Sequence, residues 1–265
     1  MNTSYKKSNF GPAFFFLNEE QKEALADIYA FCRTVDDIAD EPSSNPKGEL
    51  AGWREEIDKI FSDQKPFSEL AKALQRHAVK FNLSKENFTL LIDGMEMDLD
   101  RTEYKTFEDL EKYMYRVAVV VGLMCCEVMG LRKEEILDYA TNLGYAVQLT
   151  NIIRDVYSDI ELGRVYLPEE DMQKYGILSI DLQTKNTAAL APILSYEGEK
   201  AKEFFNKAKA LFPKQYKKQL LAAKAMGALY EAILNKIANR KYVFTEKVSL
   251  SKIEKTFVII KELVK

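Results

Sequence analysis

The chain has 265 residues, of which 47% are hydrophobic, and this fraction is typical of a soluble globular protein and excludes a disordered chain. Its 38 lysines and arginines nearly balance 41 aspartates and glutamates, so composition gives no basic footprint for nucleic acid, and we expect none as a partner. The only histidine, His77, excludes most zinc hydrolases and histidine-based acid–base enzymes, because these need two or more imidazoles. We expect His77 on a helix surface.

The cysteines and the hydropathy pattern indicate in which cellular compartment the protein is found. Cys32, Cys125 and Cys126 are odd in number and lie among apolar residues, which is typical of reduced cysteines in a core. No targeting segment is found, and no stretch reaches the roughly 18 to 20 apolar residues of a membrane span. We therefore expect a cytoplasmic protein, while a peripheral membrane contact stays open.

Helices are predicted along the whole chain. No proline occurs between Pro66 and Pro168, which favours long helices over strands separated by frequent turns. The clearest loop is predicted at residues 41–52, with further breaks at 163–176 and 179–186. We expect about eight to ten helices with short connections, forming one all-α domain over residues 1–265.

The first predicted helix carries a polar stripe. At about 100° per residue, Tyr29, Arg33, Asp36 and Asp40 fall within a stripe about 60° wide. Two carboxylates four residues apart repel each other on an isolated helix, so another group must compensate them. The flanks of this helix are apolar, which indicates a polar cavity between helices.

The same spacing of acids recurs in the second half of the chain. Gln148, Asn151, Asp155 and Asp159 share one face of a predicted helix that is otherwise apolar. A single Asp pair at this spacing is usually a solvated helix face. Two pairs, each with a cation or amide in register, leave two interpretations open, a pair of solvated faces or a joint metal site. Oxygen ligands alone select a hard cation such as Mg²⁺, which also binds diphosphates.

At these residues the sequence resembles the squalene/phytoene synthase family of head-to-head prenyltransferases, and it looks most like the bacterial members. The resemblance is carried by YAFCRTVDDIADE (29–41), LIDGMEMDLD (91–100), YMYRVAVVVG (113–122) and QLTNIIRDVYSDIELGRVYLP (148–168). It implies an isoprenoid-synthase helical bundle with a central cavity. In such a cavity two allylic diphosphates are joined with the help of two or three Mg²⁺ ions.

The resemblance also implies roles for particular residues. The implied metal ligands are Asp36, Asp40, Asn151, Asp155 and Asp159, and the four aspartates are also implied as catalytic, together with Tyr115 lining the cavity. The implied substrate contacts are Phe10, Tyr29, Arg33, Gln148, Asn151, Arg154, Arg164 and Tyr166. Asp98 is a weaker candidate, and Met95 and Met97 fit the cavity wall or core. Gly11 and Pro12 stand where many members carry an aromatic pair.

The resemblance predicts that two farnesyl diphosphates are condensed to presqualene diphosphate, with squalene or dehydrosqualene as further products. The alternative is phytoene synthesis from two geranylgeranyl diphosphates, because no motif measures the depth of the cavity. No glycine-rich dinucleotide motif is present, which leaves NADPH use open, since the reductases of this family bind NADPH without it. A non-catalytic lipid-binding relative is disfavoured, because such a protein would be expected to have lost these acids.

Overall fold

Helices form nearly all regular structure in the residues that this computed structural model describes, which are 17–40, 43–100 and 103–264. No strand is found in these ranges, apart from one isolated bridge between Glu103 and Val165. The α-helices are α1 (Glu19–Asp40), α2 (Pro46–Ile60), α3 (Glu69–Phe81), α4 (Lys85–Asp100), α5 (Phe107–Met114), α6 (Val120–Val128), α7 (Glu134–Glu161), α8 (Glu169–Lys174), α9 (Ser179–Gln183), α10 (Thr187–Ala210), α11 (Leu221–Asn239) and α12 (Lys252–Val264). The all-α prediction is confirmed.

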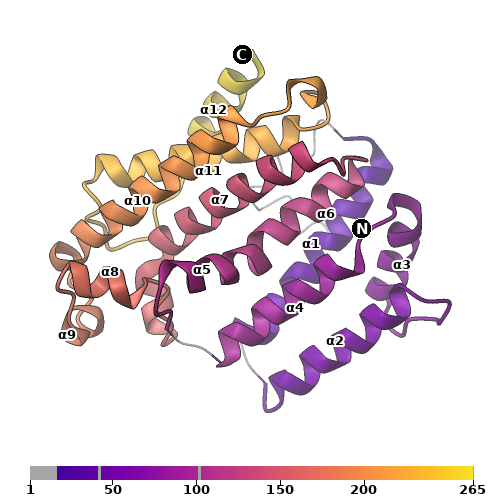
Figure 1. The fold of residues 1–265 in the computed structure, drawn as a ribbon, viewed down its shortest axis with the longest axis horizontal. Helices are drawn as coiled ribbons and strands as arrows, with labels where there is room; N and C mark the ends of the chain where they lie inside the picture. The colour runs from indigo at the N-terminus through magenta and orange to yellow at the C-terminus, as the bar shows by residue number, and fades with distance from the viewer. Residues whose placement is uncertain (1–16, 41–42, 101–102, 265) are drawn as a thin grey trace.

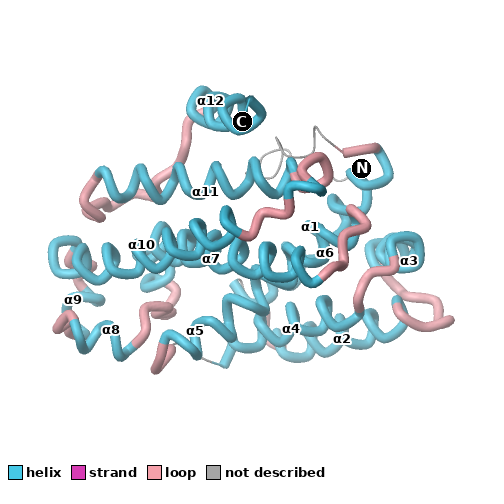
Figure 2. The backbone as a smooth tube through the Cα atoms, turned by 45° about the horizontal axis from the view of Figure 1, so that its top comes forward, coloured by secondary structure: helices cyan, strands magenta, loops and turns pink. Residues whose placement is uncertain are grey.

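The long helix α7 runs through the middle of the molecule (Figure 1). It packs against α10, α11 and α6. Helices α1 to α4 lie on one side of it and α10 to α12 on the other (Figure 1). Figure 2 shows α12 as an outer layer that rests on α11. No helix in the described ranges has the length and apolar character needed to cross a bilayer.

Two hydrophobic clusters form the core. One is built mainly by α7, α10 and α11, and the other by α1 to α4 with α6. In the second cluster the ring of Phe31 lies 5.2 Å from that of Trp53 and 5.3 Å from that of Phe88, so α1, α2 and α4 share one aromatic centre. Burial of such side chains stabilises the fold by about 1.5–3 kcal/mol each.

A short π-helix, η3 (Tyr115–Val119), joins α5 to α6 between the two clusters. It packs closely on α7, because Gly144 has no side chain there: a Cβ at this position would lie 2.9 Å from the Cα of Val119. Single π-turns inside longer helices are frequent at functional sites. Glycine therefore allows the centre of α7 to contact the backbone of this irregular segment.

The loop expectations were wrong at three places. Helix α2 begins at Pro46, inside the predicted loop 41–52, because the side chain of Asn45 accepts a hydrogen bond from the Gly48 amide at 3.1 Å and proline is compatible with the first helical position. Helix α8 lies within the predicted break at 163–176, and helix α9 occupies much of the predicted break at 179–186. The described residues thus form twelve α-helices instead of eight to ten.

The histidine and cysteine expectations had different outcomes. His77 was expected on a helix surface, yet its side chain is only 12% exposed, and its Nε2 lies 3.0 Å from the Asp27 carboxylate. The polar contact between α1 and α3 explains its burial, since a bonded imidazole can be enclosed. All three cysteines are free, in agreement with the prediction of reduced thiols.

Candidate active site

Three segments that are far apart in the sequence meet at one end of the bundle. Arg164, just after α7, donates to the Asp40 carboxylate at the end of α1 over 2.5 Å and to the Ala39 carbonyl over 2.7 Å. The hydroxyl of Tyr166 donates to Asp98 near the end of α4 over 2.7 Å. The segment that follows α7 therefore ties the carboxyl-terminal ends of α1 and α4 together.

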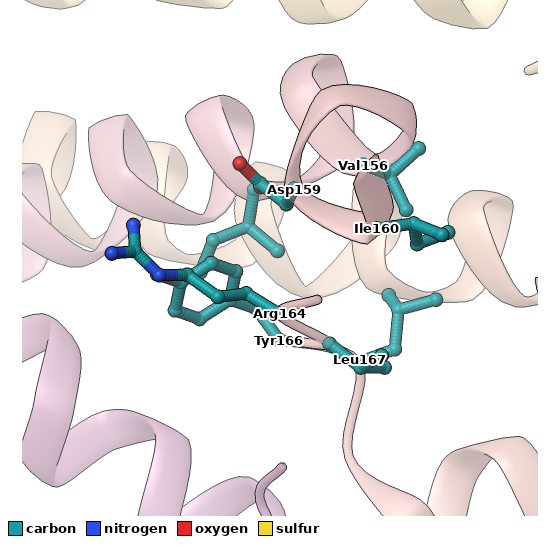
Figure 3. A pocket seen from close by; sticks show the side chains of 8 residues that line it. Val156, Asp159, Ile160, Arg164, Tyr166 and Leu167 are labelled. Atoms are coloured by element: carbon teal, nitrogen blue, oxygen red, sulfur yellow. The ribbon is translucent and has the colours of Figure 1, made fainter. Parts of the chain in front are cut away.

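A pocket lies at this end of α7. It is lined by Ile152, Val156, Asp159, Ile160, Arg164, Val165, Tyr166 and Leu167. Figure 3 shows Asp159 and Arg164 directed to the same side, away from Val156 and Leu167. One wall of this narrow, tightly packed pocket is therefore charged and the other is apolar.

Asp98 accepts hydrogen bonds from two tyrosines. The hydroxyl of Tyr113 lies 3.0 Å from one of its oxygens, the hydroxyl of Tyr166 lies 2.7 Å from the other, and the two rings stack 5.1 Å apart. Burial raises the pKa of Asp98 to about 6, against the lowering effect of the Tyr166 hydrogen bond and of Arg164. Sequence reasoning ranked Asp98 low and missed Tyr113, although Tyr113 opens the motif in which Tyr115 was chosen.

Two further carboxyl groups have perturbed proton affinities. Burial raises the pKa of Asp36 to about 6, and the neighbouring charge of Asp40 adds to this. Burial together with the charge of Asp155 raises the pKa of Asp159 to about 7, although Arg164 opposes the shift. Asp98 contributes to both shifts, so acids from α1, α4 and α7 repel one another across the site. The arrangement leaves negative charge that a cation would neutralise.

Besides Arg164, which pairs with Asp40, three further cations compensate part of the charge on the two stripes. Arg33 lies 2.5 Å from Asp36 on the exposed side of α1. Arg154 binds Asp155 through two nitrogens, at 2.8 and 2.5 Å, and both side chains are largely buried. Lys247, from the segment between α11 and α12, lies 3.1 Å from the same carboxylate. No motif pointed to Lys247, because its contact joins positions more than ninety residues apart.

Asn151 offers an oxygen that is ready to bind a ligand. Its amide nitrogen donates to Gln148 over 3.3 Å, which orients both side chains on α7. Its buried Oδ1 has no hydrogen-bond partner among the described residues. A buried acceptor without a partner costs about 1–3 kcal/mol, so this oxygen fits a place among the ligands of a metal ion.

The other predicted residues have less definite surroundings. Tyr29 is half-buried on α1, one turn before Arg33. Tyr115 is half-buried at the start of η3 and packs against the α1–α4 core cluster. Phe10, with Gly11 and Pro12, lies outside the described residues. The roles of these residues stay predictions.

The donor set fits Mg²⁺. Within the described ranges no three side chains of His, Cys, Asp or Glu lie close enough together to hold a metal by themselves. Mg²⁺ usually takes one or two carboxylates and completes its shell with water and substrate phosphates. Oxygen donors, mutual repulsion among carboxylates and the unpartnered Asn151 oxygen thus fit ions that bind together with a diphosphate.

The sequence profile of squalene/phytoene synthases matches residues 4–254. The chain belongs to the squalene/phytoene synthase family. Over 258 residues this synthase-family chain is 34% identical to a presqualene diphosphate synthase of Rhodopseudomonas palustris, covering 96% of the chain and 92% of that protein. A presqualene diphosphate synthase of Sinorhizobium fredii is 38% identical over 187 residues, 68% of this chain and 66% of that protein. A chloroplastic phytoene synthase of an Oncidium hybrid is 32% identical over 253 residues, which cover 92% of this chain and 61% of that protein.

Solved structures agree with this membership. A dehydrosqualene synthase crystallised with a ligand superposes with a TM-score of 0.88 at 28% identity, covering 98% of this chain and 92% of that one. A squalene synthase from Alicyclobacillus acidocaldarius gives a TM-score of 0.81 at 27% identity, and the superposition covers 91% of this chain and 90% of that one. The protein is therefore a Mg²⁺-dependent prenyltransferase with the isoprenoid-synthase fold, and it condenses prenyl diphosphates head to head.

Proposed function

We propose that this enzyme joins two farnesyl diphosphates to form presqualene diphosphate and releases one diphosphate. The observation that carries the proposal is the meeting of Asp36 and Asp40, Asp98, and Asp159 at one end of the bundle, beside a pocket with one charged and one apolar wall. The similarity to two bacterial presqualene diphosphate synthases supports the choice of farnesyl chains.

The metal ligands in this proposal are Asp36, Asp40, Asn151, Asp155 and Asp159, which hold two or three Mg²⁺ ions. The bound ions supply charge neutralisation and Lewis acidity to the leaving diphosphate. Arg33, Arg154 and Arg164 bind the remaining phosphate oxygens, with Gln148 as a polar contact. Their carboxylate partners hold these guanidinium groups in place before substrate arrives.

The cavity side chains protect the carbocation that forms when the C1–O bond of the first substrate breaks. The leaving diphosphate takes the bonding electrons, and the C2–C3 double bond of the second substrate attacks the cation. Tyr29 and Tyr115 supply aromatic rings that can stabilise positive charge without supplying a nucleophile. The released diphosphate accepts the proton lost on ring closure. Gly122 leaves space for a prenyl tail, since a Cβ there would meet no atom within 4 Å.

A second candidate is phytoene synthesis from two geranylgeranyl diphosphates, which the 32% identity to a phytoene synthase favours. Products beyond presqualene diphosphate are a separate question, because squalene requires reduction by NADPH and dehydrosqualene does not. Family membership is compatible with either product, squalene or dehydrosqualene, being formed at the same site.

Product analysis separates these candidates. The enzyme is incubated with Mg²⁺ and either farnesyl or geranylgeranyl diphosphate, with and without NADPH, and the extracted lipids are identified by mass spectrometry. We expect presqualene diphosphate from farnesyl diphosphate without NADPH. Phytoene as the preferred product would overturn the choice of substrate.

Point variants test the residue assignment. Asp36→Asn and Asp155→Asn each remove a negative oxygen ligand, so we expect turnover to fall at least about a hundredfold, in line with the loss of a charge-stabilising group at a reacting centre. Asp138→Asn is the matched control, because Asp138 is an exposed carboxylate on α7, 17 residues before Asp155. Full turnover in both ligand variants would refute the assigned site and leave family membership untouched.

A further inference from the structure

Helix α12 has a hydrophobic stripe on its outward face. Ile253, Phe257 and Ile260 are 82%, 68% and 55% exposed and follow the i, i+4, i+7 spacing of a single helix face. On the opposite face Val258 and Ile259 pack against the core. Figure 2 shows α12 as the outermost helix, lying on α11. We call these three exposed residues the α12 stripe.

The α12 stripe differs from the other exposed apolar side chains. No other described helix exposes three large apolar residues at helical spacing, and single exposed ones such as Val79 on α3 are ordinary on soluble proteins. Rows of exposed apolar side chains usually mark a surface that is covered in use. The helix is already fixed to the body, since Lys224 pairs with Glu262 at 3.2 Å and Lys236 pairs with Glu254 at 2.8 Å.

Positive charge is concentrated in the same part of the chain. Residues 211–265 contain 12 lysines and arginines against four acids, whereas residues 1–210 contain 26 against 37. The formal charge of the whole chain, −3, therefore divides into +8 and −11. Two of the four acids are the partners of Lys224 and Lys236. Lys252 and Lys261 flank the stripe on the helix surface, about 100° and 80° from it.

We propose that the α12 stripe docks this enzyme on an anionic lipid bilayer, with Ile253, Phe257 and Ile260 in the boundary between headgroups and acyl chains. An amphipathic helix with apolar residues on one side and lysines beside them lies in this plane of a membrane. Lys252 and Lys261 then reach lipid phosphates while their methylene stems stay in the apolar layer. A second copy of the chain is a poorer occupant, because a dimer through α12 would bring together two segments that each carry a formal charge of +8.

The docking site is directly connected to the active site. Lys247, which contacts Asp155, lies five residues before α12 begins. A bilayer bound at α12 therefore lies near the segment that approaches the diphosphate end of the cavity. Prenyl substrates and their product are lipids, so a membrane at this position would supply and receive them.

Vesicle co-sedimentation tests the proposal. The full chain is mixed with vesicles of phosphatidylcholine alone or of phosphatidylcholine with phosphatidylglycerol, and the bound fraction is measured. We expect binding to the anionic vesicles, and the triple variant Ile253→Ser, Phe257→Ser, Ile260→Ser to bind at least about tenfold more weakly. Val79→Ser is the matched control, because this exposed side chain lies on α3, and we expect no change.

Charge variants test the second half of the proposal. Lys252→Glu combined with Lys261→Glu should weaken binding to anionic vesicles by about tenfold or more and reduce its sensitivity to salt. Thermal unfolding and turnover of detergent-dispersed substrate should match the parent, since these side chains contact neither the core nor the site. Equal binding by the triple variant and the parent would overturn the proposal. So would no preference for anionic vesicles, or a parent dimer that the triple variant dissociates.

Discussion

At the scale of single residues, Asp98 organises more of the site than its motif suggests. It holds the hydroxyls of Tyr113 and Tyr166, and it faces the acids of α1 and α7. Asp98→Ala leaves the Tyr166 hydroxyl without its acceptor and Tyr113 with only a 3.4 Å hydrogen bond to Tyr166, so we expect a loss of about 1–3 kcal/mol in the free energy of unfolding. Turnover should also fall about tenfold or more, because Tyr166 loses its fixed position beside Arg164. Urea denaturation and steady-state kinetics measure the two effects.

Asp100→Ala is the matched control for this prediction. Asp100 lies two residues further along α4, and its carboxylate is 55% exposed in a surface pair with Lys47. Exposed ion pairs contribute about 0–1 kcal/mol, so stability and turnover should stay near those of the parent. Equal losses in both variants would show that the carboxylate of Asp98 has no special role.

The residue scale also shows how much the sequence can predict. The two acid stripes follow from spacing along one helix, and both helices are present. The repulsion within each stripe indicated that another group must compensate it, and Arg33 lies 2.5 Å from Asp36. The contacts of Asp98 with Tyr113 and Tyr166, and of Lys247 with Asp155, join separate segments of the chain. Such contacts depend on how helices pack, and no local pattern in one sequence encodes them.

At the scale of helices, two glycines make a matched pair of tests. A Cβ at Gly144 on α7 would lie 2.8 Å from Cγ2 and 2.9 Å from Cα of Val119, so Gly144→Ala must push α7 away from η3. We expect a destabilisation of about 1–3 kcal/mol, as for overpacking in a core. Gly122→Ala meets no atom within 4 Å, so higher helix propensity should stabilise the protein by about 0.5–1 kcal/mol. Thermal unfolding of both variants gives the comparison, and a Gly144→Ala variant as stable as the parent would contradict the close packing.

Helix boundaries show where sequence reasoning reaches its limit at this scale. The absence of proline between Pro66 and Pro168 correctly favoured long helices, and α7 extends over 28 residues. The cluster of prolines, serines and glycines at 41–52 suggested a loop, but Asn45 and Pro46 begin a helix there. Proline is compatible with the first helical position and disfavoured further in, although α10 accommodates Pro192, so the same residue type can mark a start, a break or neither. The π-turn at η3 depends on packing against α7 and has no sequence signal.

At the scale of the whole molecule, raised carboxyl pKa values link proton binding to stability. Besides the acids of the site, Glu197 is fully buried on α10, where Lys200 lies 3.2 Å from it and also pairs with Asp171 at 2.7 Å. Burial raises the pKa of Glu197 from 4.5 to about 8, although Lys200 opposes the shift. The folded state therefore holds this proton in a pH range where the unfolded chain has released it.

The sign of the resulting pH dependence follows from linkage. Between the unfolded pKa of 4.5 and the folded pKa of about 8, the folded protein binds more protons at Glu197 than the unfolded chain does, so stability falls as pH rises. Asp159, with a pKa of about 7, acts in the same direction. We expect the free energy of unfolding, measured in urea, to decrease steadily from about pH 5 to about pH 8. Glu197→Gln keeps a neutral side chain of the same shape and should flatten the upper part of this curve.

Glu199→Gln is the matched control. It is an exposed change on the same helix beside Lys202 and should leave the pH dependence of stability unaltered. A Glu197→Gln curve parallel to that of the parent would show that the buried carboxyl is already ionised at neutral pH.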